Sequence, residues 1–198
     1  MQTRYTVFMQ KKRLDRITTV VKSRRSDIVV VLEDIHDPHN AAAILRTCDA
    51  LGIQNVYFVF EKEKPFNPKR VGKASSSSAN KWLDFTLFDS LHQCINTLVQ
   101  DGYTIIATAL TDQSESLATA KFPEGKIALL VGNEHSGLSH EAIAQSDRVV
   151  MIPMKGFVQS LNVSVATAVI LWDIFSKRIM SPLEKTEQKK LIEEFSKR

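Results

Sequence analysis

The sequence contains few cysteines and has no long apolar run. Cys48 and Cys94 are the two cysteines in 198 residues and form no spacing pattern, so we expect a reducing, cytoplasmic setting. No apolar stretch approaches the length that crosses a membrane. The opening residues, MQTRYTVFMQKKR, carry charges where a secretory signal is apolar. We therefore expect a cytoplasmic protein with no membrane partner.

Two nucleotide-binding motifs are also missing. No GxGxxG occurs in the chain, which argues against a dinucleotide-binding fold. Gly132 and Gly137 have P-loop spacing, but Leu138 stands where a P-loop needs lysine to reach the β- and γ-phosphates, which argues against hydrolysis of nucleoside triphosphates. His36 and His39 flank one turn without a third ligand in view, so no metal site is expected.

Basic residues gather at the start of the chain. The net charge is only +4, but residues 1–25 hold a single acid, Asp15. Their basic members are Arg4, Lys11, Lys12, Arg13, Arg16, Lys22, Arg24 and Arg25. Leu14, Ile17, Val20 and Val21 recur at helical spacing, which predicts an amphipathic helix over residues 11–24. A basic helix is the footprint of a polyanion partner, although a solvated helix face gives the same pattern.

Strands and helices are predicted to alternate along the chain. The predicted strands are 28–33, 56–60, 82–88, 103–109, 126–132 and 148–153. Helices are predicted from Asp37-Pro38 to Gly52, from a Ser90 cap to Gly102, after a Ser139 cap, and over 163–180. This order predicts one domain with a mostly parallel α/β sheet and helices on both faces. The serine run 75–78 is either a flexible linker or a loop packed near a ligand.

Three polar clusters follow predicted strands, where ligands bind in such sheets. The first, EDIHDPHNAAAILR, holds Asn40 and Arg46; a helix N-terminus and a planar guanidinium both suit a phosphate, while a cap and a surface ion pair are the ordinary alternatives.

The second cluster, LLVGNEHSGLS, carries one carboxylate, Glu134, which either orients a ligand or holds a loop. In the third, QSLNVS, Ser160 and Asn162 are two residues apart and cannot share a helix face. A turn that aims them into one cavity is expected, and helix capping explains only part of the set.

The three clusters together resemble the motifs of the SPOUT methyltransferases. The order is N-x5-R, then GNExxG, then IPMKGFVQSLNVSVATAVILW, and HDPHNAAAILRTCDALG is similar to the TrmH branch, the tRNA (guanosine-2'-O)-methyltransferases that act on guanosine 18 of the D-loop. The resemblance extends from Arg4-Tyr5 to about residue 180. It implies an α/β knot fold with a C-terminal trefoil knot, a homodimer with its active site near the subunit interface, and S-adenosylmethionine as cofactor.

The resemblance also implies residue roles. Arg46 matches the catalytic arginine, and the other matching motif residues are Asn40, Glu134, Ser160 and Asn162. Cofactor contacts are matched by Thr108, Gly132, Ile152 and Leu161. Docking of tRNA is expected from Arg13, Arg16, Arg24 and Arg25. Arg46 either accepts the proton of the ribose 2'-hydroxyl transiently or stays charged and stabilises the developing alkoxide, because a guanidinium normally keeps its proton.

The sequence thus predicts three parts. Residues 1–26 form a basic helical extension that docks tRNA, residues 27–180 form the methyltransferase domain, and residues 181–198 form a helical tail. Two other hypotheses remain open. One is a related enzyme that modifies another tRNA position or ribosomal RNA, and the other is an RNA-binding module without catalysis.

Overall fold

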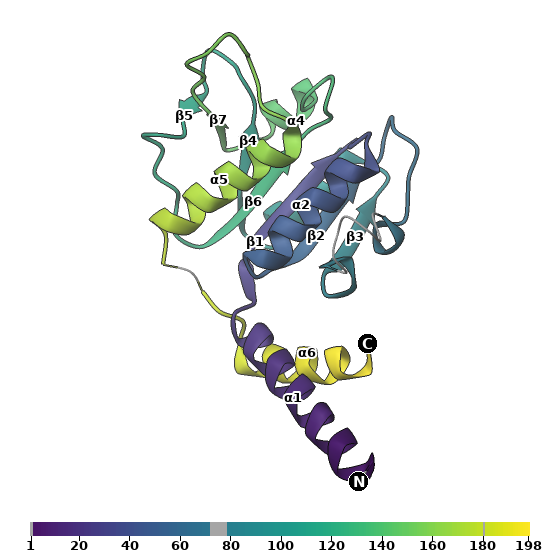
Figure 1. Cartoon of the computed structure of the whole chain (residues 1–198). Helices are drawn as coiled ribbons and strands as arrows, with labels where there is room; N and C mark the ends of the chain where they lie inside the picture. Colours follow the sequence, from purple (N-terminus) through teal and green to yellow (C-terminus); the bar gives the residue numbers. More distant parts are fainter. Residues whose placement is uncertain (1, 72–78, 180) are drawn as a thin grey trace.

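A seven-stranded sheet forms the centre of the protein. The computed structural model describes residues 2–71, 79–179 and 181–198, so the serine run 75–78 lies outside the described residues. The strand order is β3-β2-β1-β6-β4-β7-β5, and all pairings between the named strands are parallel, which confirms the predicted sheet (Figure 1). The strands are β1 (Arg25–Glu33), β2 (Ile53–Val59), β3 (Asp84–Phe88), β4 (Tyr103–Thr108), β5 (Glu115–Ser116), β6 (Lys126–Val131) and β7 (Arg148–Met151).

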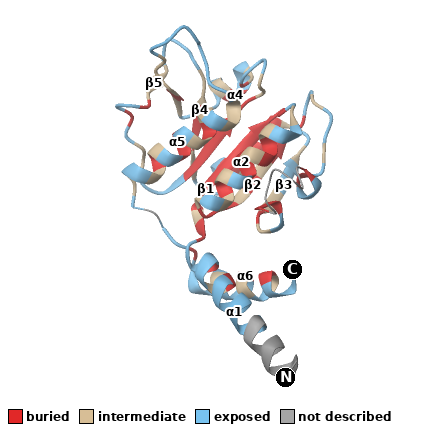
Figure 2. Ribbon diagram, in the orientation of Figure 1, coloured by how far each residue is buried: buried red, intermediate tan, exposed pale blue. Residues whose placement is uncertain are grey.

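Helices cover both faces of this sheet, as predicted. The apolar run of β1 alternates its side chains between the faces, so Val30 packs under α2 (Pro38–Ala50) and α5 (Val163–Lys177), while Val29 packs under α3 (Leu91–Gln100) and α4 (His140–Ala144). Figure 2 shows the resulting buried band through the middle of the sheet. The three predicted polar clusters begin at or near the carboxyl ends of β1, β6 and β7.

Helix caps explain where the main helices begin. Asp37 accepts a hydrogen bond from the backbone N of His39 at 2.8 Å and caps α2. Ser139 accepts from the backbone N of Ala142 at 3.0 Å and caps α4. Ser90 occupies the N-cap position of α3, as predicted, but its hydroxyl makes no cap hydrogen bond. Oε1 of Glu61 accepts from the Leu91 N instead, at 2.7 Å.

Strand β7 occupies an unusual place in the sheet. It follows β5 and β6 in sequence, yet it lies between β4 and β5 and pairs with both. A chain that returns to fill a gap between two earlier strands is consistent with the expected knot. The knot itself stays a prediction.

Two helices stand apart from the sheet. Helices α1 (Gln2–Lys22) and α6 (Lys185–Lys197) pack against each other below it (Figure 1). They enclose a small apolar core of Ile17, Val21, Leu191 and Phe195, with Leu183 from the segment before α6. Within the described residues, no helix is long and apolar enough to cross a membrane.

Two of the arginines predicted to bind tRNA form the joint between this helix pair and the sheet. Arg24 and Arg25 are only 1% and 3% exposed. The Arg24 guanidinium pairs with the carboxylate of Asp49, and Nη2 of Arg25 lies 3.2 Å from Oδ1 of Asp27. Burial lowers the pKa of Arg25 and outweighs the opposing effect of Asp27. The exposed docking role expected for Arg24 and Arg25 is therefore corrected to a structural one.

Candidate active site

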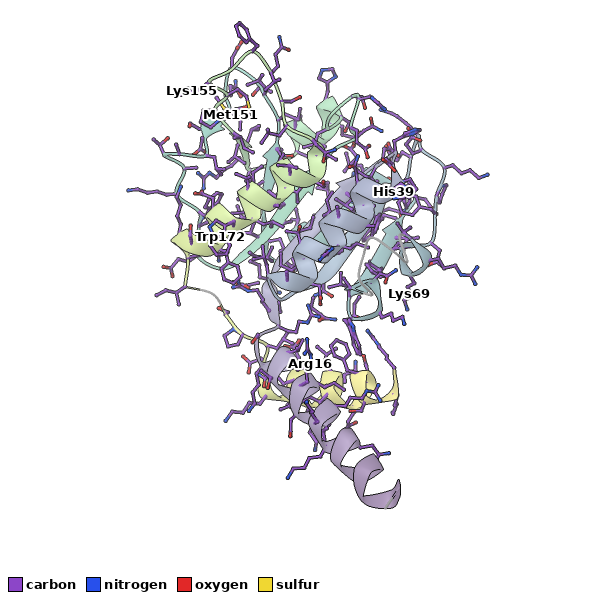
Figure 3. All side chains as sticks on the ribbon, viewed as in Figure 1. Arg16, His39, Lys69, Met151, Lys155 and Trp172 are labelled. Carbon is purple, nitrogen blue, oxygen red and sulfur yellow. The ribbon has the colours of Figure 1, made fainter. Side chains whose placement is uncertain are left out.

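A cavity of about 350 Å³ opens at the carboxyl ends of β4, β6 and β7. Figure 3 marks Met151 at the end of β7 beside it. The structure brings together six of the nine predicted catalytic and cofactor residues along its wall. They are Thr108, Gly132, Glu134, Ile152, Ser160 and Leu161. Asn40, Asn162 and Arg46 do not line it.

The loop after β6 closes tightly and requires a glycine at its start. Asn133 and Gly137 exchange backbone hydrogen bonds of 3.1 and 3.0 Å, and Nδ2 of Asn133 donates to the backbone O of Asp34 at 2.7 Å. A Cβ at position 132 would lie 2.2 Å from the carbonyl carbon of Gly137 and from the nitrogen of Leu138. Gly132 therefore lets two backbone segments touch at the floor of the cavity.

Glu134 holds the loop that begins α2. Its Oε2 accepts from the backbone N of His36 at 2.9 Å, and its Oε1 accepts from the backbone N of Asp37 at 3.0 Å and from Nδ2 of Asn40 at 2.9 Å. Partial burial raises the pKa of Glu134, but these donors stabilise the carboxylate and leave the pKa below its ordinary value. The sequence left open whether Glu134 orients a ligand or holds a loop, and these hydrogen bonds show that it holds the loop.

Asn40 and Asn162 extend this network to the third motif. Nδ2 of Asn162 donates to Oδ1 of Asn40 at 3.0 Å, so the chain Asn162–Asn40–Glu134 connects all three predicted clusters. Oδ1 of Asn162 also accepts from the backbone N of Ser164 at 2.9 Å and caps α5. Asn162 thus serves as a cap and as a link between the motifs, and its side chain fixes where α5 begins.

Arg46 lies on the outer face of α2, away from the cavity. It is exposed, and it takes part in no hydrogen bond or ion pair within the described part of the chain. Ala43 and Thr47 on the same side of α2 line a shallow groove with Val165 and Trp172 of α5, and Figure 3 marks Trp172 there. Within one chain, Arg46 therefore lies on the side of α2 that borders the α2–α5 groove and not on the cavity side.

The cavity wall combines apolar and polar side chains and therefore suits a ligand that has both kinds of group. Val150, Ala166 and Ile170 line it together with Asn133 and Ser160. The prediction omitted Val150, Ala166, Ile170 and Asn133. Asn133 could have been found from its place beside Glu134 in the second motif, whereas helix α5 contributes its residues only through tertiary packing.

The histidines of the first motif do not form a metal site. Nδ1 of His36 lies 2.9 Å from Oε2 of Glu63, and this hydrogen bond raises the pKa of His36. The rings of His36 and His135 meet edge to face at 5.7 Å. Across the described ranges, no three His, Cys, Asp or Glu side chains are grouped to hold a metal ion.

Residues 27–172 match the model of the SpoU rRNA Methylase family. The chain belongs to this family. This SpoU methylase is 38% identical over 168 residues to the tRNA (guanosine(18)-2'-O)-methyltransferase of Thermus thermophilus, a match that covers 85% of this chain and 84% of the relative. It is 34% identical over 170 residues to the enzyme of the same name from Escherichia coli K12, covering 86% and 72% of the two chains.

Solved structures show the same architecture. The Aquifex aeolicus TrmH/SpoU tRNA modifying enzyme matches with a TM-score of 0.85 and 30% identity, covering 96% of this chain and 97% of that one. The SpoU methyltransferase AviRb from Streptomyces viridochromogenes, in complex with the cofactor AdoMet, matches with a TM-score of 0.68 at 24% identity over 80% of this chain and 63% of that one. The A. aeolicus match extends over nearly the whole chain and confirms the predicted fold class.

Proposed function

We propose that this SpoU methylase transfers a methyl group from S-adenosylmethionine to the ribose 2'-hydroxyl of guanosine 18 in the tRNA D-loop. The observation that carries the proposal is the network Asn162–Asn40–Glu134, which joins the three motif segments beside one cavity. The bacterial relatives at 38% and 34% identity, whose names give this reaction, support the choice of guanosine 18.

The cavity fits the proposed cofactor in its chemistry. Its wall offers apolar side chains such as Ile152 and Leu161 for a flat adenine, and polar groups near Thr108 and Gly132 for ribose hydroxyls. Oγ1 of Thr108 donates to the backbone O of Leu130 at 2.9 Å, and its lone pairs can still accept a hydrogen bond from a ribose hydroxyl. When bound, S-adenosylmethionine would supply a methyl group on a sulfonium sulfur.

The protein's part in the reaction is alignment and charge. The new bond joins the ribose O2' to the methyl carbon, the bond from that carbon to sulfur breaks, and the hydroxyl proton leaves to solvent. We propose that Arg46 stays charged and stabilises the developing alkoxide and a neighbouring phosphate. Its side chain is exposed and has no carboxylate partner in the described residues, so it is free to meet RNA. We propose that Ser160, which lines the cavity, contacts the reacting groups.

We infer that the active form is a homodimer. Along α5, Val165, Val169 and Trp172 are 48%, 40% and 63% exposed, and they line the groove beside α2. An apolar helix face of this kind is typical of a subunit interface. Arg46 shares the outer side of α2 with the groove residues Ala43 and Thr47, so a second copy on this face would bring each Arg46 toward the partner subunit. Light scattering tests this: the protein should have twice the monomer mass, and Trp172→Glu should be monomeric.

Docking of tRNA is proposed for the helix pair, with residues 27–180 as the catalytic part and residues 1–26 and 181–198 as the docking part. Arg13 and Arg16 are exposed on α1 and remain available, whereas Arg24 and Arg25 are buried. Replacing Arg13 and Arg16 with glutamine should weaken tRNA binding and flatten its dependence on salt, because fewer counterions are released. Affinity for S-adenosylmethionine should stay unchanged. Because the proposed substrate is tRNA, we also propose that the protein is cytoplasmic.

The deciding experiment maps methylation sites. Purified protein is incubated with S-adenosylmethionine and transcript tRNA, and 2'-O-methyl positions are read along the RNA. Methylation at guanosine 18 supports the proposal. Methylation at another tRNA position, or only in ribosomal RNA, would show that the protein acts on a different substrate. If calorimetry detects no binding of S-adenosylmethionine, the protein is an RNA-binding module. Near-normal turnover by Arg46→Lys would exclude the transient-base role, and Arg46→Ala should bind RNA but lose turnover.

A further inference from the structure

A second hollow lies where the helix pair meets the sheet body. It has a volume of about 230 Å³ and is separate from the cavity described above. Helix α1 contributes Arg13, Arg16 and Val20, helix α6 contributes Phe195, and the body contributes Asp49 and Trp82. The hollow therefore forms at the junction of the helix pair and the body, which the Arg24–Asp49 ion pair and the Trp82–Phe195 ring contact both span.

Aromatic side chains form one part of its lining. The Trp82 ring is partly exposed and meets the buried Phe195 ring edge to face, with centroids 5.1 Å apart and planes at 63°. The guanidinium group of Arg198 also covers Phe195, with its Cζ 4.8 Å from the centroid of the ring. A partly exposed indole that is fixed from behind is a stacking platform for a flat ring.

Charge is distributed unevenly around this platform. Arg13 and Arg16 are three residues apart on α1, so both reach the same side of the hollow, and both are exposed. Asp49 supplies the opposite charge: Oδ1 pairs with Arg24, and the side chain remains 31% exposed. The occupant should therefore have an apolar face, an N–H group that can donate to Asp49, and an attached anion.

A nucleotide of single-stranded RNA combines these properties. Its base has two apolar faces and N–H donors on its edge, and its phosphates suit arginine. A lipid chain offers no donor for Asp49, and a paired stem keeps its bases stacked inside. We propose that the hollow takes one unstacked nucleobase of the bound RNA, which stacks on Trp82 while its phosphates contact Arg13 and Arg16. This rests on the proposed function only in taking RNA as the substrate.

Trp82 itself can report on this contact. The chain has two tryptophans, so Trp172→Phe leaves Trp82 as the single indole fluorophore without altering the hollow. Addition of tRNA, or of a short single-stranded RNA, should quench Trp82 emission as the base stacks. Polyphosphate of matched charge should bind the arginines without quenching. The converse variant, Trp82→Phe, reports Trp172 and should show no such change.

Binding measurements give a second test. Trp82→Leu should weaken RNA binding roughly ten- to hundredfold, the usual effect of losing one base–aromatic stack, while Trp82→Phe should largely restore it. Circular dichroism checks that α6 still packs. Quenching by polyphosphate as strong as that by RNA, or no quenching at saturating RNA, would overturn the proposal. Quenching is measured on the Trp172→Phe variant and methylation on the wild-type protein. Methylation of guanosine 18 without quenching then refutes the hollow alone, and quenching without that methylation refutes the proposed function alone.

Discussion

Asn40→Asp tests the network that joins the three motifs. The substitution keeps the shape of the side chain and the oxygen that accepts from Asn162. It replaces the Nδ2 donor, which lies 2.9 Å from Oε1 of Glu134, with a second carboxylate oxygen. Two carboxylates then face each other at the position where the wild-type protein has a hydrogen bond.

The cost can be worked from this geometry. If the two carboxylates relax to about 4 Å, their repulsion is about 1 kcal/mol in water and about 4 kcal/mol at an effective dielectric constant of 20. Loss of the hydrogen bond adds about 1 kcal/mol. The half-open site lies between these limits, so the free energy of unfolding should fall by about 2–5 kcal/mol. For a chain of this size the melting temperature should fall by roughly 6–15 °C.

The loss should depend on pH in a defined direction. Repulsion needs both carboxylates ionised, so the folded variant binds a proton more tightly than the unfolded chain does. Its stability should then be close to that of the wild-type protein near pH ~4, where one carboxyl is protonated and can donate to the other, and should decrease as the pH rises toward ~7. Thermal melts at fixed protein concentration over this range measure the effect, and calorimetry follows cofactor affinity.

Asn40→Ala is the matched control. It loses the hydrogen bond with Glu134, as the aspartate variant does, and also the one with Asn162, but it adds no charge, so its loss of stability should change little between pH ~5 and ~8. If the aspartate and alanine variants lose stability in parallel at every pH, Glu134 does not carry its charge beside residue 40, and the reasoning fails.

Three further predictions concern neighbouring features. Gly132→Ala should displace the loop at the cavity floor and greatly weaken cofactor binding in calorimetry, whereas Gly156→Ala, whose Cβ would meet no atom within 4 Å, should leave binding intact. Asn162→Ala should lower the free energy of unfolding by about 1 kcal/mol through loss of the α5 cap, measured by denaturant titration, and should reduce methyl transfer. The hydrogen bond with Glu63 is the main cause of the raised pKa of His36. The stabilisation that protonated His36 gains from this bond is complete below the ordinary histidine pKa of about 6.5 and is lost as the pH rises through the raised value. Glu63→Gln should lower the titration midpoint of His36 measured by NMR, and an unchanged midpoint would contradict the prediction.

The sequence predicts the main strands and helices well because their signals are local. The β-branched run of β1, the Asp37-Pro38 start of α2 and the Ser139 cap of α4 each depend on a few adjacent residues. Strand β5 was missed because it contains only Glu115 and Ser116, which pair with β7 more than thirty residues later.

The errors and gaps arise from contacts between distant residues. Arg24 and Arg25 look like exposed basic residues in the sequence, but both are buried at the joint, where they lie over the rings of Phe195 and Phe175. The position after predicted strands placed Asn40 and Glu134 at the ligand-binding edge of the sheet, but it could not predict their hydrogen bond, because 94 residues separate them and no local pattern pairs them. The cavity positions of the predicted cofactor residues are now seen, while their chemical roles stay predictions.

The packing of α1 against α6 has a consequence for synthesis on the ribosome. Ile17 and Val21 emerge early, but Leu191 and Phe195, which complete their core, emerge only after the whole sheet has been translated. The sheet can therefore assemble before Phe195 is available to pack against the Trp82 ring. A nascent chain would therefore have its basic helix but would lack the completed surface that we propose for RNA docking until the sheet has been translated.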